Sequence, residues 1–143
     1  MNAFRKLSDT MLASPQIDLA DVAAAKAAGI TLIVNNRPDG EDPSAPQGAE
    51  IAGAAEAAGI AYVSIPIGHA GFSEPQVDAL IAALDGNDGI ALGYCRSGTR
   101  STLLWALAQA KQGMNPDAIA AAAAQAGYDI SPVRPMVDML AAR

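Results

Sequence analysis

One seven-residue segment, Cys95 to Ser101, brings a thiol and two guanidinium groups together and reads CRSGTRS. An apolar run over 89–94 leads into this segment, and a run typical of a helix follows it from Thr102. A loop between a strand and a helix can bind anions, because consecutive backbone N–H groups point inward and the helix adds the positive end of its dipole. We therefore expect this loop to be an oxyanion site that carries its own nucleophile.

The residue types in this loop suggest separate chemical roles. The positive field favours the thiolate form of Cys95, which is the nucleophilic form of a cysteine. Gly98 permits a backbone turn that a residue with a Cβ resists, and Arg100 offers a planar, two-pronged fork to an oxyanion. Arg96 adds a second positive charge. Ser101 is predicted to donate a hydrogen bond to the sulfur and to ease its departure from a covalent intermediate.

Three interpretations of this loop stay open at this point. A lone cysteine is often a small buried apolar residue, although its place between a strand and a helix favours a reactive thiolate. The loop could also bind anions without any turnover. In each anion-binding interpretation the substrate or ligand contacts come from Arg96, Ser97, Gly98 and Thr99.

Two further side chains lie in loops that we expect at the same edge of the sheet. Arg37 belongs to a polar turn, RPDGE, and His69, the only histidine, lies in a Gly-rich loop. The turn around Arg37 is either a solvated loop or a second wall of the anion pocket. His69 is either an exposed or structural side chain or a member of the site.

The elements that must position these residues alternate along the chain. Apolar runs predict strands, and Ala-rich segments with caps predict helices. This alternation is typical of a parallel sheet with crossover helices on both faces, so we predict a single α/β domain over 1–143 with three layers. Ligands bind such sheets at the carboxyl ends of the strands. The expected strands are 30–34, 60–65 and 89–94, with one or two short edge strands possible before Asp18; the expected helices are 18–28, 48–58, 73–84, 102–112, 116–127 and one from Ser131-Pro132.

Composition excludes several classes of function. Asp and Glu number 15 against 9 Lys and Arg, a net charge of −6, which disfavours nucleic-acid binding. The longest apolar run, 118–124, is far shorter than a membrane span, and residues 1–14 lack the apolar stretch of a signal peptide. The single cysteine and the absence of zinc-ligand spacing exclude a disulfide framework and predict no metal and no cofactor. We expect a cytoplasmic protein with a free thiol; nothing in the sequence marks an oligomer interface.

Three segments taken together resemble the beta-lactamase hydrolase-like, phosphatase-like family. They are IVNNRPDGE from Ile33, GIAYVSIPI from Gly59, and CRSGTRS from Cys95 with Trp105 after it. The resemblance extends over about residues 3–142. It is a resemblance to small bacterial domains that occur alone or ahead of a metallo-β-lactamase-type domain.

The resemblance implies a fold similar to that of dual-specificity and tyrosine phosphatases, and a hydrolase that acts on a phosphomonoester. Cys95 would then be the nucleophile. The backbone from Arg96 to Arg100 would hold the phosphate, and the Arg100 side chain would clamp it. Ser101 would assist breakdown of the phosphocysteine.

Three features of this sequence differ from the phosphatase pattern and leave an alternative. Four residues separate Cys95 from Arg100, where phosphatases of that fold have five, and rhodanese-type sulfurtransferases often read CRSGxRS with a six-residue loop. Tyr94 also stands where the family usually has His. The loop after the IPI strand contains no Asp to act as general acid, so His69 or Glu74 would have to take that role. A rhodanese-like sulfurtransferase that forms a Cys95 persulfide needs no such acid.

Overall fold

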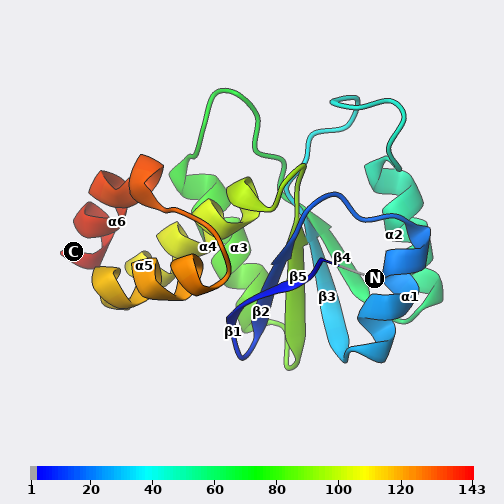
Figure 1. Cartoon of the computed structure of the whole chain (residues 1–143), viewed down its shortest axis with the longest axis horizontal. Coiled ribbons are helices and arrows are strands. Elements are labelled where there is room, and N and C mark those ends of the chain that lie inside the picture. Colours follow the sequence, from blue (N-terminus) through cyan, green and yellow to red (C-terminus); the bar gives the residue numbers. More distant parts are fainter. Residues whose placement is uncertain (1–2) are drawn as a thin grey trace.

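A five-stranded sheet forms the middle layer of the computed structural model, which describes residues 3–143 (Figure 1). The strand order is β1-β2-β5-β3-β4, and every pairing is parallel except the antiparallel pair of β1 and β2. The strands are β1 (Arg5–Ser8), β2 (Met11–Ser14), β3 (Ile30–Asn35), β4 (Ala61–Ser64) and β5 (Ile90–Tyr94). The helices are α1 (Leu19–Ala27), α2 (Gly48–Ala57), α3 (Glu74–Asp85), α4 (Thr99–Lys111), α5 (Pro116–Gln125) and α6 (Arg134–Ala141), with a 3-10 turn, η1 (Ser131–Val133), before α6.

Helices cover both faces of the sheet, which confirms the predicted three-layer α/β architecture. Helices α1 and α2 lie on one face, and α3 to α6 lie on the other (Figure 1). The side chains of β3 divide between these faces because successive residues of a strand point in opposite directions. Leu32 and Val34 pack into the core beneath α3 to α6, whereas Ile33 packs into the core beneath α1 and α2.

Helix α4 begins earlier than the sequence indicated. It starts at Thr99, not at Thr102, because Gly98 takes the left-handed conformation, with φ of +93°, and turns the chain directly into the helix. Arg100 therefore belongs to the first turn of a helix rather than to a free loop. Helix α4 is buried along most of its length, and the Trp105 side chain is only 1% exposed. The site is thus attached to the most deeply packed helix of the fold.

The two ends of the chain also refine the prediction. The segment before Asp18 forms two strands, of which β1 is an edge strand and β2 pairs with β5 inside the sheet. The last helix is preceded by η1, so α6 starts three residues later than Ser131. Within residues 3–143, no helix has the length and apolar character that a membrane crossing requires.

Close packing of α4 against β5 depends on Gly93. A Cβ at this position would lie 2.9 Å from Met11 Cε and 3.2 Å from Ser101 Cβ. We expect Gly93→Ala to lower the free energy of unfolding by about 1–3 kcal/mol, the usual cost of overpacking a core.

Gly53→Ala is the matched control, because a Cβ at Gly53 in α2 would meet no atom within 4 Å. We expect this change to raise the free energy of unfolding by about 0.5–1 kcal/mol through helix propensity. Chemical denaturation of both variants measures the difference. Equal free energies of unfolding for Gly93→Ala and Gly53→Ala would show that β5 and α4 are not packed this closely.

Candidate active site

The CRSGTRS segment lies between the carboxyl end of β5 and the first turn of α4, as predicted. Cys95 directly follows the last residue of β5 and is 0% exposed. The Gly98 N–H donates a hydrogen bond to Cys95 Sγ at 3.2 Å, so a polar group of the loop contacts the sulfur. The sulfur therefore lies at the base of a polar loop, and the thiol is free.

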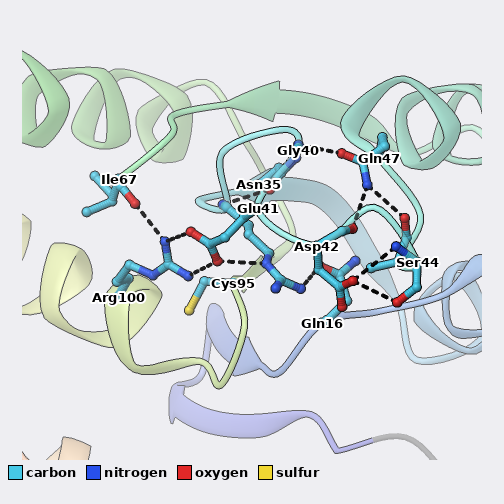
Figure 2. Close-up of polar contacts among 12 residues, drawn as sticks. Gln16, Asn35, Gly40, Glu41, Asp42, Ser44, Gln47, Ile67, Cys95 and Arg100 are labelled. Carbon is cyan, nitrogen blue, oxygen red and sulfur yellow. Dashed lines mark hydrogen bonds and ion pairs between the residues drawn. The ribbon is translucent and has the colours of Figure 1, made fainter. Parts of the chain in front are cut away.

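Arg100 is held from outside the loop by a carboxylate, as Figure 2 shows. Glu41 accepts from Arg100 Nη1 at 2.8 Å and from Nη2 at 2.6 Å, and the Ile67 carbonyl accepts from Nη1 at 2.8 Å. A guanidinium has five N–H groups, and the Nε–H and the second Nη2–H, which lie side by side on one edge, make no hydrogen bond to any residue within 3–143. That edge is suited to bidentate binding of an oxyanion.

The charges of Glu41 and Arg100 are mutually stabilised. The hydrogen bond from Arg100, with help from Arg37, lowers the pKa of Glu41 from 4.5 to about 2, although burial opposes the shift. The same hydrogen bond, which Arg100 donates to Glu41, raises the pKa of Arg100 against the effect of burial. Both groups stay ionised over the whole physiological range.

This pair should make the stability of the fold sensitive to acid. Because the pKa of Glu41 is lower in the folded protein than in the unfolded chain, its stabilisation is complete above about pH 4.5 and is lost as the pH falls toward 2. The parent should lose free energy of unfolding over this window. We expect Glu41→Gln to lose about 1–2 kcal/mol less than the parent, after allowance for solvent screening. Chemical denaturation at neutral and acidic pH measures this difference.

Glu56→Gln serves as the control, because Glu56 is an exposed carboxylate on α2. Glu56→Gln should lose as much stability in acid as the parent does. If Glu41→Gln also lost as much as the parent, the Glu41 ion pairs would not contribute to folding.

Arg37 links Glu41 to the other side of the site. Its Nε donates to Glu41 Oε1 at 2.8 Å, and its Nη1 donates to Gln16 Oε1 at 3.0 Å. The side chain is only 10% exposed, so Arg37 is a wall of the site and not a solvated turn residue. Of the two interpretations that the sequence left open, the structure favours the wall.

An open pocket of about 600 Å³ lies above these residues. Among the predicted site residues, Arg37, His69, Arg96, Ser97 and Arg100 line it, whereas the others do not: these are Cys95, Gly98, Thr99 and Ser101. His69 is an exposed side chain at this pocket rather than a packed one. The remaining lining residues are Glu41, Asp42 and Gly68.

Ser97 and Thr99 are joined by short contacts within the loop. Ser97 Oγ donates to Thr99 Oγ1 at 3.0 Å and accepts from the Thr99 N–H at 3.4 Å. Both hydroxyls thus lie at the start of α4. Their contacts help to fix the shape of the loop around Gly98.

Ser101 does not make the contact that the sequence suggested. Its hydroxyl donates its one proton to Asn36 Oδ1 at 2.7 Å instead of to the Cys95 sulfur. Asn36 is itself fixed, because its Nδ2 donates to the Ile65 carbonyl at 2.9 Å. The Ser101 hydroxyl takes this partner because the residue is only 1% exposed and faces a buried amide oxygen that needs a donor.

Glu74 is removed from the list of possible acids. It is the first residue of α3 and is paired with Lys111 and Arg143, at 2.7 and 2.8 Å. The hydrogen bonds from Arg143 and Lys111 lower the pKa of Glu74 to about 2. A carboxyl that is ionised in this way has no proton to give at neutral pH.

The sequence analysis included Glu41 only as part of the RPDGE turn, with no role of its own, and it missed Asn36. Both belong to the NNRPDGE segment that follows β3, which lies next to β5 in the sheet. The signal available in the sequence was the two consecutive polar residues and the turn at the carboxyl end of a buried strand. Only the strand order shows that this strand ends beside Cys95.

The match to known proteins agrees with this geometry. Residues 3–112 match the family described as beta-lactamase hydrolase-like protein, phosphatase-like domain. A beta-lactamase hydrolase-like protein of Xylella fastidiosa is 35% identical over 103 residues, which is 71% of this chain and 24% of the relative. That of Agrobacterium fabrum is 31% identical over 76% of this chain and 25% of its own length. The chain thus spans about a quarter of the length of these curated relatives.

Solved structures show the same fold over the whole chain. A Neisseria meningitidis protein described as a candidate phosphatase is 33% identical, with a TM-score of 0.83 over 98% of this chain and 99% of that one. Tk-PTP in its active form, at 14% identity, has a TM-score of 0.77 over 99% and 97% of the two chains, which shows the fold alone. These neighbours confirm the tyrosine-phosphatase-like fold, and with the sequence match they establish that the chain belongs to the beta-lactamase hydrolase-like, phosphatase-like family.

Proposed function

We propose that this protein is a cysteine-dependent phosphatase that hydrolyses a phosphomonoester through a phosphocysteine. The observation that carries the proposal is the free edge of Arg100. Glu41 holds the end of the guanidinium, so its Nε–H and one Nη2–H remain for an oxyanion at the loop that contains Cys95. The phosphatase-like family and the fold of the neighbours support the same chemistry.

The proposed reaction has two steps. In the first, the Cys95 thiolate attacks phosphorus, a P–S bond forms, and the P–O bond to the leaving group breaks. In the second, water attacks the phosphorus, the P–S bond breaks, and the thiolate and inorganic phosphate are released. In both steps the guanidinium edge and the loop N–H groups bind the phosphoryl oxygens, whose negative charge they stabilise.

The leaving oxygen needs a proton when the alcohol is a poor leaving group. His69 is the candidate donor, because it lines the same pocket as Arg100 and has a proton to give when it is charged. We expect His69→Ala to lower turnover of an alkyl phosphate by about 10²-fold and that of an activated aryl phosphate much less. Steady-state rates with a series of leaving groups test this. An equal loss across the series would remove His69 from the role of acid.

The pocket also indicates the substrate class. Its lining residues are charged or polar side chains and one glycine, and they include no Phe, Tyr, Trp, Leu, Ile or Val. We infer that the substrate is a small, polar phosphate ester. A phosphotyrosine side chain, whose ring gains most from apolar contact, fits this lining less well.

Sulfur transfer is the second candidate function, and loop length favours it. The loop has four residues between Cys95 and Arg100, as rhodanese-type loops do. In that reaction Cys95 attacks the outer sulfur of thiosulfate, the S–S bond breaks, and sulfite leaves. The persulfide then gives its terminal sulfur to cyanide or to a thiol, which restores the Cys95 thiolate.

Two parallel assays separate these functions. The parent protein and Cys95→Ser are each given an aryl phosphate, and separately thiosulfate with cyanide. Release of phosphate by the parent alone supports the phosphatase. Formation of thiocyanate by the parent alone, without phosphate release, would contradict it and support sulfur transfer. Turnover in neither assay, with phosphate still bound, would leave an anion-binding module.

A further inference from the structure

The geometry points to Tyr128 as a positioning residue for the Cys95 thiolate, an inference that rests on the proposed role of Cys95 as the nucleophile. Tyr128 lies after α5, beyond the residues 3–112 that match the family, and far from the loop in sequence. Its hydroxyl donates to the Ser97 carbonyl at 3.1 Å. It therefore contacts the backbone of the loop from the side opposite to the sulfur.

Tyr128 and Cys95 both make hydrogen bonds to the same peptide group, the one between Ser97 and Gly98. The C=O of Ser97 and the N–H of Gly98 belong to the same planar unit, and no described peptide bond is cis. In a trans peptide these two groups point in opposite directions. Because Tyr128 holds the carbonyl at one end, the N–H at the other end is directed at Cys95 Sγ, 3.2 Å away.

The Tyr128 ring is held firmly enough to impose this orientation. The Arg5 guanidinium stacks over it at 5.4 Å from the ring centre, and Arg5 Nη1 also donates to the Ala126 carbonyl at 3.2 Å. The ring lies so close to Gly98 that a Cβ there would overlap the Tyr128 hydroxyl. Burial, the largest cause, raises the pKa of Tyr128, so that its hydroxyl remains protonated and able to donate.

Glycine makes such a restraint necessary. Gly98 lacks the Cβ that limits rotation of the peptide groups on either side of it, so the Ser97–Gly98 peptide can turn if nothing holds it. When it turns, Cys95 loses a hydrogen-bond donor that stabilises its charged form more than its neutral form. The hydroxyl of Tyr128 thus acts on the sulfur through the backbone.

Tyr128→Phe tests this inference, because it removes only the hydroxyl. The single cysteine allows the thiolate to be followed by its ultraviolet absorbance, with Cys95→Ser subtracted as the baseline. We expect the thiolate fraction at mildly acidic pH to fall about tenfold, as for the loss of a hydrogen bond to a charged group. The acid limb of the rate profile should move to higher pH, with kcat recovering where the thiolate does.

Tyr94→Phe is the matched control. Tyr94 precedes Cys95 in the chain, but its side chain packs into the core beneath α1 and α2, and its buried hydroxyl has no hydrogen-bond partner among the described residues. Its loss should leave the thiolate fraction within about twofold of the parent. Thermal unfolding of both variants shows whether a change arises from loss of the fold.

The outcomes separate the inference from the proposed function. A parent protein without a thiolate at neutral pH would overturn the proposed nucleophile, and the inference with it. A parent that has the thiolate, together with a folded Tyr128→Phe that titrates like the parent, would overturn the inference alone. An equal change in Tyr94→Phe would also overturn it, because the loss of a hydroxyl that makes no hydrogen bond to the loop would then have the same effect.

Discussion

The Cys95→Ser protein is expected to lose at least about 10⁴-fold in turnover while it still binds inorganic phosphate. A serine hydroxyl keeps its proton at neutral pH, so it lacks the nucleophilicity of the thiolate. The anion site is retained because Arg100 is held by Glu41 and by the Ile67 carbonyl, none of which involves the sulfur. Steady-state assays give the loss, and calorimetric titration with phosphate gives the binding.

Cys95→Ala controls for a residual reaction of the serine hydroxyl and should be equally inactive. Residual turnover above about a hundredth of the parent in both variants would contradict a nucleophilic role for Cys95. Loss of phosphate binding in both, with the fold intact, would show instead that the thiol shapes the anion site.

The Arg100→Lys protein is expected to lose about 10²–10³-fold in kcat/KM, as when a transition-state donor is removed. An ammonium group is a point charge and lacks the planar fork that binds Glu41 with its end and an oxyanion with its edge. Most of the loss should be in kcat, because the charge on the phosphoryl oxygens increases in the transition state. Steady-state kinetics separate kcat from KM.

Arg96→Lys is the comparison, since Arg96 is exposed at the rim of the same pocket. The Arg96→Lys substitution should raise KM a few-fold and leave kcat near the parent value. If the two variants behaved alike, the charge of the pocket, and not the orientation set by Glu41, would account for the effect of Arg100.

The fold was predictable because its signals are local and agree with one another. Apolar runs such as ITLIV and IALGY are too short for helices, and each lies between capped Ala-rich segments, so strand and helix are assigned with little ambiguity. The start of α4 was not predictable in the same way. It depends on the left-handed backbone of Gly98, which brings Thr99 and Arg100 into the helix.

The loop with Cys95 and Arg100 was predictable because its chemistry lies within seven residues. The groups that hold it were not, because they come from elsewhere in the chain. Glu41 lies 59 residues from Arg100, and Tyr128 lies 31 residues from Ser97. Contacts of this kind depend on strand order and helix packing. The same limit explains why Ser101 was assigned to the sulfur: its buried partner, Asn36, is 65 residues away.

Mass analysis of acid-quenched protein tests the central claim most directly. The parent is mixed with an excess of an aryl phosphate, quenched during turnover, digested and compared with Cys95→Ser. We expect a phosphoryl group on the Cys95 peptide of the parent and none on the corresponding peptide of the variant. Rapid turnover with Cys95 never phosphorylated, or with the phosphoryl group on another residue, would contradict it.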